Sequence, residues 1–185
     1  MKTIQTILML GFCLLILSCS KVPLLNSENE IPLSQFGDGI IEFSSEYRPA
    51  PGPWSSFVIL GEPDTYPDYG DEVTAWASKT KDDADEMIAI AFDTAQYVNN
   101  ISIYETYNPG AVSAVSVRNK ENGSWVPVYS DGYELNLKAE SRIMQIDFPT
   151  TTFLVDAVKI NIASKVIKGW NEIDAVSISG FYEKE

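Results

Sequence analysis

The stretch EMIAIAFDTAQYVNNISIYE, residues 86–105, decides the fold class of this chain. Apolar side chains recur at every second position in both of its halves. These alternating residues are Ile88, Ile90 and Phe92, then Ile101 and Ile103. A period of two places alternate side chains on one face of an extended strand. The stretch therefore predicts two strands, 86–93 and 98–105, each with one buried face.

Seven further segments have a strand-like apolar character, and short polar connections separate them. They are 40–43, 57–60, 112–117, 125–129, 142–148, 154–162 and 173–181. No stretch shows a convincing amphipathic helical pattern, and 79–86 would form little more than one helical turn. The sequence predicts an all-β, antiparallel β-sandwich of about nine strands.

The connections carry turn-forming residues, of which Asn108-Pro109-Gly110 is the clearest example. Proline sets φ and glycine tolerates positive φ, so this tripeptide predicts a tight turn. We expect the Glu105 carboxylate to satisfy backbone amides of this turn or tyrosine hydroxyls near it. A role of Glu105 or Tyr107 in ligand binding is the alternative.

The first 18 residues have the layout of a secretory signal, with Lys2 followed by an apolar run from Ile4 to Leu17. Ser18-Cys19 closes the run and resembles the lipobox of bacterial lipoproteins. The resemblance implies cleavage before Cys19 and a lipid on this residue, at the outer membrane or cell surface. An ordinary signal peptide with Cys19 incidental is the alternative. We expect a signal at 1–18, a tether at 19–35 and one folded domain at 36–185.

Composition excludes several classes of function. The chain has 26 acidic and 13 basic residues, a net charge of −13, which argues against nucleic acid as a partner. It suits calcium or a neutral ligand such as a sugar, although solubility alone also explains an acidic surface. The chain has no histidine, and its two cysteines, Cys13 and Cys19, both precede the domain. These absences remove histidine and thiolate catalysis and favour a binding module over a hydrolase.

Three motifs together resemble the discoidin superfamily, the galactose-binding-like jelly rolls related to coagulation-factor type C domains. They are the Tyr69–Ser78 loop YGDEVTAWAS, the paired strands of 86–105 and the closing strand WNEIDAV at 170–176. The phrase IYETYNPGAV at 103–112 is similar to a subgroup that includes pappalysin-like modules. The resemblance implies a jelly-roll sandwich that recognises a glycan or a protein.

Acidic residues in one predicted loop form a candidate calcium site. Asp64, Asp68 and Asp71 lie close together on a segment that contains proline and glycine. Calcium prefers six to eight oxygen ligands on a bent loop. In related jelly rolls a glutamate at the start of the last strand reaches the same ion, and Glu172 has the matching position. We expect a structural Ca²⁺ at Asp68, Asp71 and Glu172, with a solvated acidic loop as the alternative.

Aromatic residues in the predicted connections suggest carbohydrate binding, because flat rings stack on the apolar face of a sugar. We expect the ligand-binding residues to be Trp54, Tyr66, Tyr69, Arg48, Trp170 and Asn171. Tryptophans at strand edges more often close a core, which is the alternative for Trp76, Trp125 and Trp170.

The predicted function is non-catalytic carbohydrate recognition by a surface lipoprotein, which would contact the membrane through its lipid alone. A protein-interaction or accessory module of a cell-surface complex is the alternative. With 26 acids in the chain, no carboxylate pair can be nominated for hydrolysis.

Overall fold

The computed structural model describes residues 29–184, and this part of the chain is an antiparallel jelly-roll β-sandwich with almost no helix. The prediction of an all-β fold is confirmed. The strands are β1 (Glu30–Phe36), β2 (Gly39–Phe43), β3 (Glu86–Tyr107), β4 (Val112–Asn119), β5 (Trp125–Tyr129), β6 (Arg142–Asp147), β7 (Val155–Ile162) and β8 (Glu172–Glu183).

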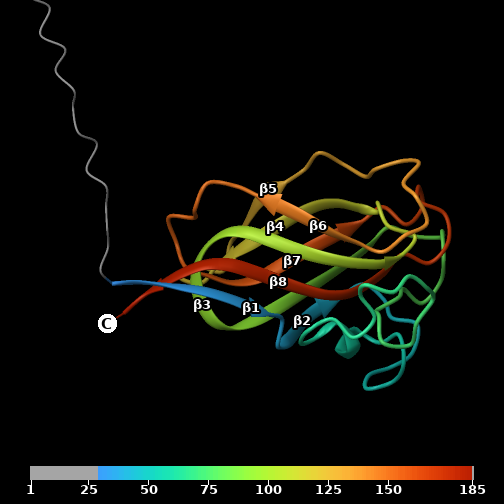
Figure 1. The fold of residues 1–185 in the computed structure, drawn as a ribbon, viewed down its shortest axis with the longest axis horizontal. Coiled ribbons are helices and arrows are strands. Elements are labelled where there is room, and N and C mark those ends of the chain that lie inside the picture. The colour runs from blue at the N-terminus through green and yellow to red at the C-terminus, as the bar shows by residue number, and fades with distance from the viewer. Residues whose placement is uncertain (1–28, 185) are drawn as a thin grey trace, which may run out of the picture.

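The strands form two layers (Figure 1). The first layer, sheet A, has the order β1-β8-β3-β6, and the second, sheet B, has the order β2-β3-β7-β4-β5. Every pairing is antiparallel. Strand β3 belongs to both layers, because Glu86–Ala91 pairs with β7 while Tyr97–Tyr107 pairs with β8.

The two strands predicted within 86–105 are one continuous strand that bends from one sheet into the other. The register with β7 shifts between Ala91 and Gln96, and this is where β3 changes layers. Buried Gln96 supports the bend: its Oε1 accepts from Gln35 Nε2 at 2.6 Å, and its Nε2 donates to Leu33 O at 3.0 Å. These contacts satisfy the polar atoms that a bend between two sheets would otherwise bury unpaired.

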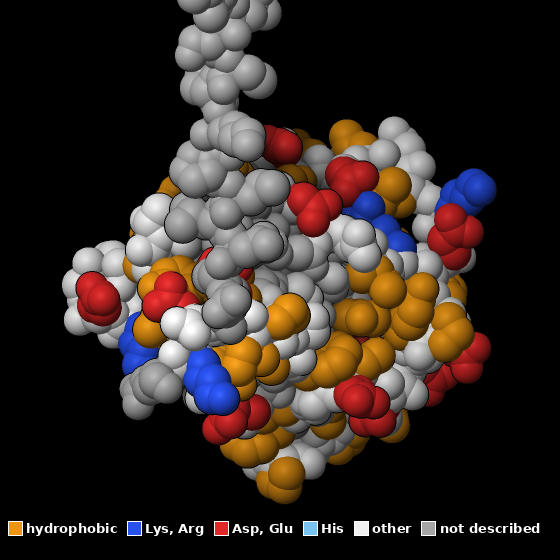
Figure 2. Space-filling model, turned by 60° about the vertical axis from the view of Figure 1, so that its left-hand side comes forward, with side chains coloured by type: hydrophobic (Ala, Val, Ile, Leu, Met, Phe, Trp, Pro, Cys, Tyr) orange, Lys and Arg blue, Asp and Glu red, His pale blue; other side chains and the backbone are white. Residues whose placement is uncertain are grey.

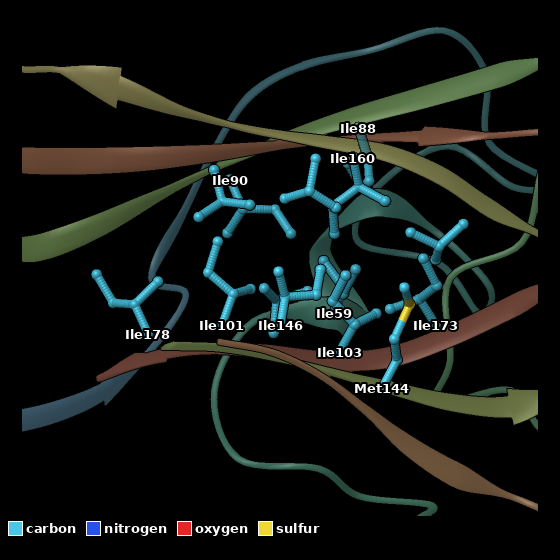
Figure 3. Close-up of a cluster of buried hydrophobic side chains, with 14 of the residues drawn as sticks. Ile59, Ile88, Ile90, Ile101, Ile103, Met144, Ile146, Ile160, Ile173 and Ile178 are labelled. Carbon is cyan, nitrogen blue, oxygen red and sulfur yellow. The ribbon is translucent and has the colours of Figure 1, made fainter. Parts of the chain in front are cut away.

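The core lies between the layers and is built largely from isoleucine (Figure 3). Ile88, Ile90 and Ile160 extend from sheet B toward Ile101 and Ile103 of sheet A, and all five are fully buried. Burying each such side chain contributes about 2 kcal/mol of transfer free energy. The alternation in 86–105 therefore identified core residues from both sheets correctly.

The domain begins earlier than the sequence predicted. Strand β1 pairs with β8 from Glu30↔Glu183 to Phe36↔Ser177, so residues 30–35 belong to sheet A and not to a tether. The signal at 1–18, Cys19 and the rest of the predicted tether lie outside the described residues. Within residues 29–184, no helix is long and apolar enough to cross a membrane.

Two shorter predictions also differ from the structure. Residues 57–60 were predicted as a strand, but Ser56–Ile59 forms a 3₁₀ helix whose first turn is capped by the Ser55 hydroxyl. Ile59 is fully buried while Phe57 is 54% exposed, so only part of this apolar run faces the core. Residues 79–85 contain no helical turn.

The longest irregular connection lies at the end of the sandwich opposite the termini. In Figure 1 the connection between β2 and β3, residues 44–85, lies at the right, whereas β1 begins and β8 ends at the left. At the end where β1 begins, acidic side chains are scattered over the surface (Figure 2).

Glu105 anchors the predicted turn at 108–110, as expected. Its Oε1 accepts from Gly110 N at 2.7 Å, and its Oε2 accepts from Arg142 Nε at 2.6 Å. Gly110 has a φ of +106°, in the left-handed region that favours glycine. Arg142 also donates to Glu134 at 2.8 Å. Glu105 is 3% exposed, and burial raises its pKa despite the opposing effect of Arg142.

We predict that Arg142→Leu destabilises the fold by about 3 kcal/mol at pH 7, since it leaves the Glu105 carboxylate buried without its cation. A raised pKa means that the folded state favours protonated Glu105. The stability that this preference contributes is complete at low pH and is lost as the pH rises. Without Arg142 this pKa rises further. The loss of unfolding free energy caused by Arg142→Leu should therefore become smaller as the pH falls toward about 4.3, the ordinary pKa of glutamate.

Urea unfolding at pH 7 and at pH 4.5 measures this effect. Lys165→Leu is the control, because the Lys165–Asp85 pair is exposed and spans 3.8 Å. It should cost less than about 1 kcal/mol at both pH values. An Arg142→Leu cost that is equal at both pH values would contradict the prediction.

Candidate functional site

The loop end of the sandwich is held by a buried aspartate on the central strand β8. Asp174 is 1% exposed, and its two carboxylate oxygens accept three backbone N–H bonds. The donors are Asp64 at 3.1 Å, Thr65 at 3.1 Å and Tyr66 at 2.8 Å. Three donors compensate much of the cost of burying one carboxylate. This contact fixes the start of the acidic loop against sheet A.

The same connection is attached to β8 at two more points. Glu72 N donates to Glu172 Oε2 at 3.2 Å. Trp76 forms an isolated bridge with Ile173, through bonds of 2.9 and 3.2 Å. Trp76 is 1% exposed, so this tryptophan does close the core, which was the alternative considered for it.

A second loop, residues 44–56, packs on the anchored segment and carries two aromatic rings. Tyr47 N donates to Ala77 O at 2.9 Å, and Trp54 N donates to Val73 O at 3.0 Å. The Glu46 carboxylate holds the loop closed by accepting from Ala50 N at 3.1 Å and Ser56 N at 2.8 Å. Trp54 has a φ of +54°, which is rare for a bulky residue and is maintained here by these surrounding contacts.

Trp170 reaches the same place from the connection between β7 and β8. Asn108 Nδ2 donates to Trp170 O at 2.8 Å, and Asn171 Nδ2 donates to Asn108 O at 3.0 Å. Gly169 N donates to Asp82 Oδ1 at 2.8 Å. Gly169 has a φ of +102°, in the left-handed region that favours glycine, and a Cβ there would lie 2.6 Å from Asn108 Nδ2.

These segments enclose a pocket of about 80 Å³. It is lined by Tyr47, Trp54, Asp71, Ala77, Trp170 and Glu172. The Tyr47 ring meets Trp54 edge-on, with centroids 5.4 Å apart, and meets Trp170 edge-on at 5.6 Å. The volume is well below the roughly 300–1,000 Å³ of an enclosing small-molecule site. The pocket therefore suits part of a ligand, the remainder of which stays exposed.

Three polar atoms of the pocket residues are buried without a hydrogen-bond partner in the described part of the protein. They are Trp54 Nε1, Trp170 Nε1 and Glu172 Oε1. Buried polar groups in native proteins are usually paired, so each unpaired group needs an explanation. Two donors and one acceptor with unused hydrogen-bonding capacity therefore belong to residues that line the pocket.

The Asp71 and Glu172 carboxyl groups contact one another. Burial raises the pKa of Glu172 to about 9, and the neighbouring Asp71 charge adds to the rise while the Glu72 N–H opposes it. Two carboxyl groups can share a hydrogen bond only when one of them is protonated. Groups in direct contact also lack the separation of about 5–9.5 Å that places two carboxyls around a glycosidic bond. The arrangement can bind and orient a ligand, but it does not resemble a pair for glycoside hydrolysis.

The calcium ligands predicted from the sequence do not assemble into one group. Asp71 and Glu172 lie together, but residues 29–184 contain no set of three or more acidic, histidine or cysteine side chains that could hold a metal ion. Asp68 does not line the pocket. The carboxyl pair supplies few of the oxygens that Ca²⁺ requires, so we derive no role for calcium from it.

The structure separates the residues predicted to bind a ligand. Trp54 and Trp170 line the pocket. Tyr66 packs on Tyr104 at 5.4 Å, and Tyr69 packs on Tyr107 at 5.6 Å.

The other two predicted residues lie just outside the pocket. The Arg48 guanidinium lies over the Tyr47 ring at 5.4 Å. Asn171 is 5% exposed, and its Nδ2 donates to Asn108 O in the neighbouring turn. Tyr69 instead lines a second hollow of about 140 Å³, beside Asn108 and Glu134.

Two residues that define the site were not selected from the sequence. Tyr47 is the central ring of the pocket, and its position next to Arg48 in a polar connection was the only available signal. Asp174 follows Ile173 in a closing strand that is otherwise apolar from Ala175 to Ile178, apart from Ser177. An acid in such a strand indicates a buried anion that needs donors, and this signal could have identified it.

The family model for the C-terminal SD scarf domain of pappalysin-1 matches residues 26–185. The matched range includes residues 103–112. No curated protein matches the chain.

Several solved structures share the fold at low sequence identity. A chitosan-binding module 1 from a chitosanase/glucanase of Paenibacillus sp. IK-5 has a TM-score of 0.53 and 15% identity, covering 82% of this chain and 95% of that one. Reduced XRCC1 bound to the DNA polymerase β catalytic domain has a TM-score of 0.58 and 10% identity, covering 83% and 100%. Allantoicase from Saccharomyces cerevisiae has a TM-score of 0.50 and 14% identity, covering 76% and 39%. These likenesses show the fold.

We predict that Asp174→Asn destabilises the fold by about 2 kcal/mol, because the amide nitrogen would face backbone donors and leave them unpaired. Hydrogen exchange of the amides of residues 64–66 should accelerate more than that of the β3 core. Asp147→Asn is the matched control, since Asp147 is exposed and accepts only from Asn100 Nδ2 at 2.8 Å. The control should cost less than about 0.5 kcal/mol. Similar costs for both variants in urea unfolding would show that Asp174 does not anchor the loop.

Proposed function

This chain belongs to the family of the C-terminal SD scarf domain of pappalysin-1, and we propose that it is a non-catalytic module that binds carbohydrate at the aromatic pocket. The observation that carries the proposal is the set of three rings with unpaired polar atoms beside them. Tyr47, Trp54 and Trp170 offer apolar surface, and the polar atoms are two indole N–H groups and Glu172 Oε1.

These groups match the two kinds of surface on a sugar. The C–H face of a pyranose packs against an aromatic ring, and its hydroxyls both donate and accept hydrogen bonds. The indole N–H groups of Trp54 and Trp170 would donate to hydroxyl oxygens, while the carboxyl groups of Glu172 and Asp71 would accept from hydroxyls. A fold with the same architecture serves in a chitosan-binding module.

The small volume of the pocket sets the expected strength of binding. A ligand that is only partly enclosed buries little surface, so affinity at a single site is modest. Many copies held on one surface would bind a repeating glycan more strongly, because later contacts form at high effective concentration.

We predict that a glycan array probed with the full-length chain in detergent shows selective binding that Trp54→Ala and Trp170→Ala each weaken about tenfold or more. Trp125→Ala is the control, because Trp125 lies on β5 and does not line the pocket. Arg48→Ala and Tyr69→Ala test predicted residues outside the pocket. Parallel arrays with Ca²⁺ and with chelator test the calcium prediction. No selective binding by a folded chain would contradict the proposal.

A protein partner is the second candidate function, and one observation favours it. The connection between β5 and β6 exposes three large apolar side chains: Tyr133 at 43%, Leu135 at 58% and Leu137 at 38%. Exposed apolar groups that lie close in the chain are typical of interaction surfaces. Binding that fails on glycans but is lost on changing Leu135 and Leu137 to serine would favour an accessory module of a surface complex.

A lipid at Cys19 would place the module outside the cytoplasm, at the outer membrane or cell surface. Two cysteines of the same segment allow a matched test. We predict that bacterial cells expressing the full chain incorporate a labelled fatty acid into it, that Cys19→Ser abolishes the label, and that Cys13→Ser leaves it unchanged. Equal labelling of both variants would contradict lipid attachment at Cys19.

A further inference from the structure

Among the described residues, the ionisable acids that line the pocket have no basic residue beside them in its wall. Asp71 and Glu172 line it, and no Lys or Arg does so. Neither carboxyl group takes part in a salt bridge within residues 29–184. The buried acids other than Glu172 have donors or a cation: Glu105 has Arg142, Asp174 has three backbone N–H groups, and Glu86 accepts from the Ser44 hydroxyl.

Glu172 is 1% exposed and, within residues 29–184, has no cation beside it. Its Oε2 has one backbone donor at 3.2 Å, its Oε1 has no donor in the described structure, and its carboxyl group contacts only the neighbouring acid Asp71. A donor that carries positive charge is the group that such an oxygen binds most strongly. An ammonium group offers three N–H donors, enough to reach both Glu172 and Asp71.

The aromatic rings favour the same kind of group. The face of an indole or phenol ring attracts a cation, and tryptophan does so most strongly. Two cations of this chain already lie over rings of the pocket: Lys81 Nζ is 5.6 Å from the Trp170 centroid, and the Arg48 guanidinium is 5.4 Å from that of Tyr47. Neither residue lines the pocket, so its interior stays acidic.

We propose that the pocket selects a sugar bearing a free, positively charged amine, so that amino sugars bind better than their N-acetylated or neutral counterparts; this rests on the proposed carbohydrate function. The ammonium group lies between the Asp71–Glu172 carboxyl pair and the aromatic rings. A volume of about 80 Å³ has room for an ammonium group and one edge of the sugar ring that carries it. Sugars that carry a carboxylate or sulfate are excluded, because two acids line the wall.

Titration calorimetry of the full-length chain with three oligosaccharides of equal length tests the proposal. The probes are oligomers of glucosamine, N-acetylglucosamine and glucose, at a pH where the glucosamine amine is protonated. We expect the glucosamine oligomer to bind about tenfold more tightly than the other two. Asp71→Asn should remove this preference, because the variant loses the charge that attracts the amine but keeps the shape of the side chain.

Asp68→Asn is the matched control. It makes the same change on the same loop but outside the pocket, and it should keep the preference for the free amine. Circular dichroism confirms that each variant is folded. Equal affinity for the three oligomers, or a preference that survives Asp71→Asn, overturns the amine proposal and leaves carbohydrate binding standing. No binding of any oligomer by the folded chain overturns the amine proposal, and the absence of selective binding on the glycan array as well overturns carbohydrate binding.

Discussion

The loops at one end of this sandwich are held in place because buried carboxyl groups need hydrogen-bond donors. Strand β8 buries the side chains of Asp174 and Glu172, and a buried anion without a partner would lower the free energy of unfolding by several kcal/mol. Backbone amides of residues 64–66 and 72 supply the donors. A long connection with little regular structure thereby gains a fixed position. The second loop then packs on the first, and the rings of Tyr47 and Trp54 take their places from it.

Local pattern was enough to predict the sheet but not its connections. The alternation at 86–105 identified residues of both layers, because burial of one strand face needs no knowledge of the partner strand. The continuity of β3 depends on Gln96 meeting Gln35, 61 residues away. Strand β1 has Pro32 and a weak alternation, as expected of an edge strand that pairs only with β8. Its sequence therefore looks like a tether.

The site was predictable as a set of residue types and not as an arrangement. Trp54 and Trp170 were chosen for sugar binding, while Asp71 and Glu172 were chosen for calcium. The structure brings all four to one pocket through contacts such as Glu72 to Glu172, which are 100 residues apart in the chain. Nothing local distinguishes Tyr47 from Tyr66 or Tyr69, since each is an aromatic in a polar connection. Only closure of the loop around Glu46 decides which ring faces the pocket.

The position of the termini determines how the pocket meets its surroundings. Strand β1 begins, and β8 ends, at the end of the sandwich away from the pocket loops (Figure 1). The pocket loops therefore lie far from the points where β1 begins and β8 ends. A partner domain fused at either terminus would leave the pocket unobstructed.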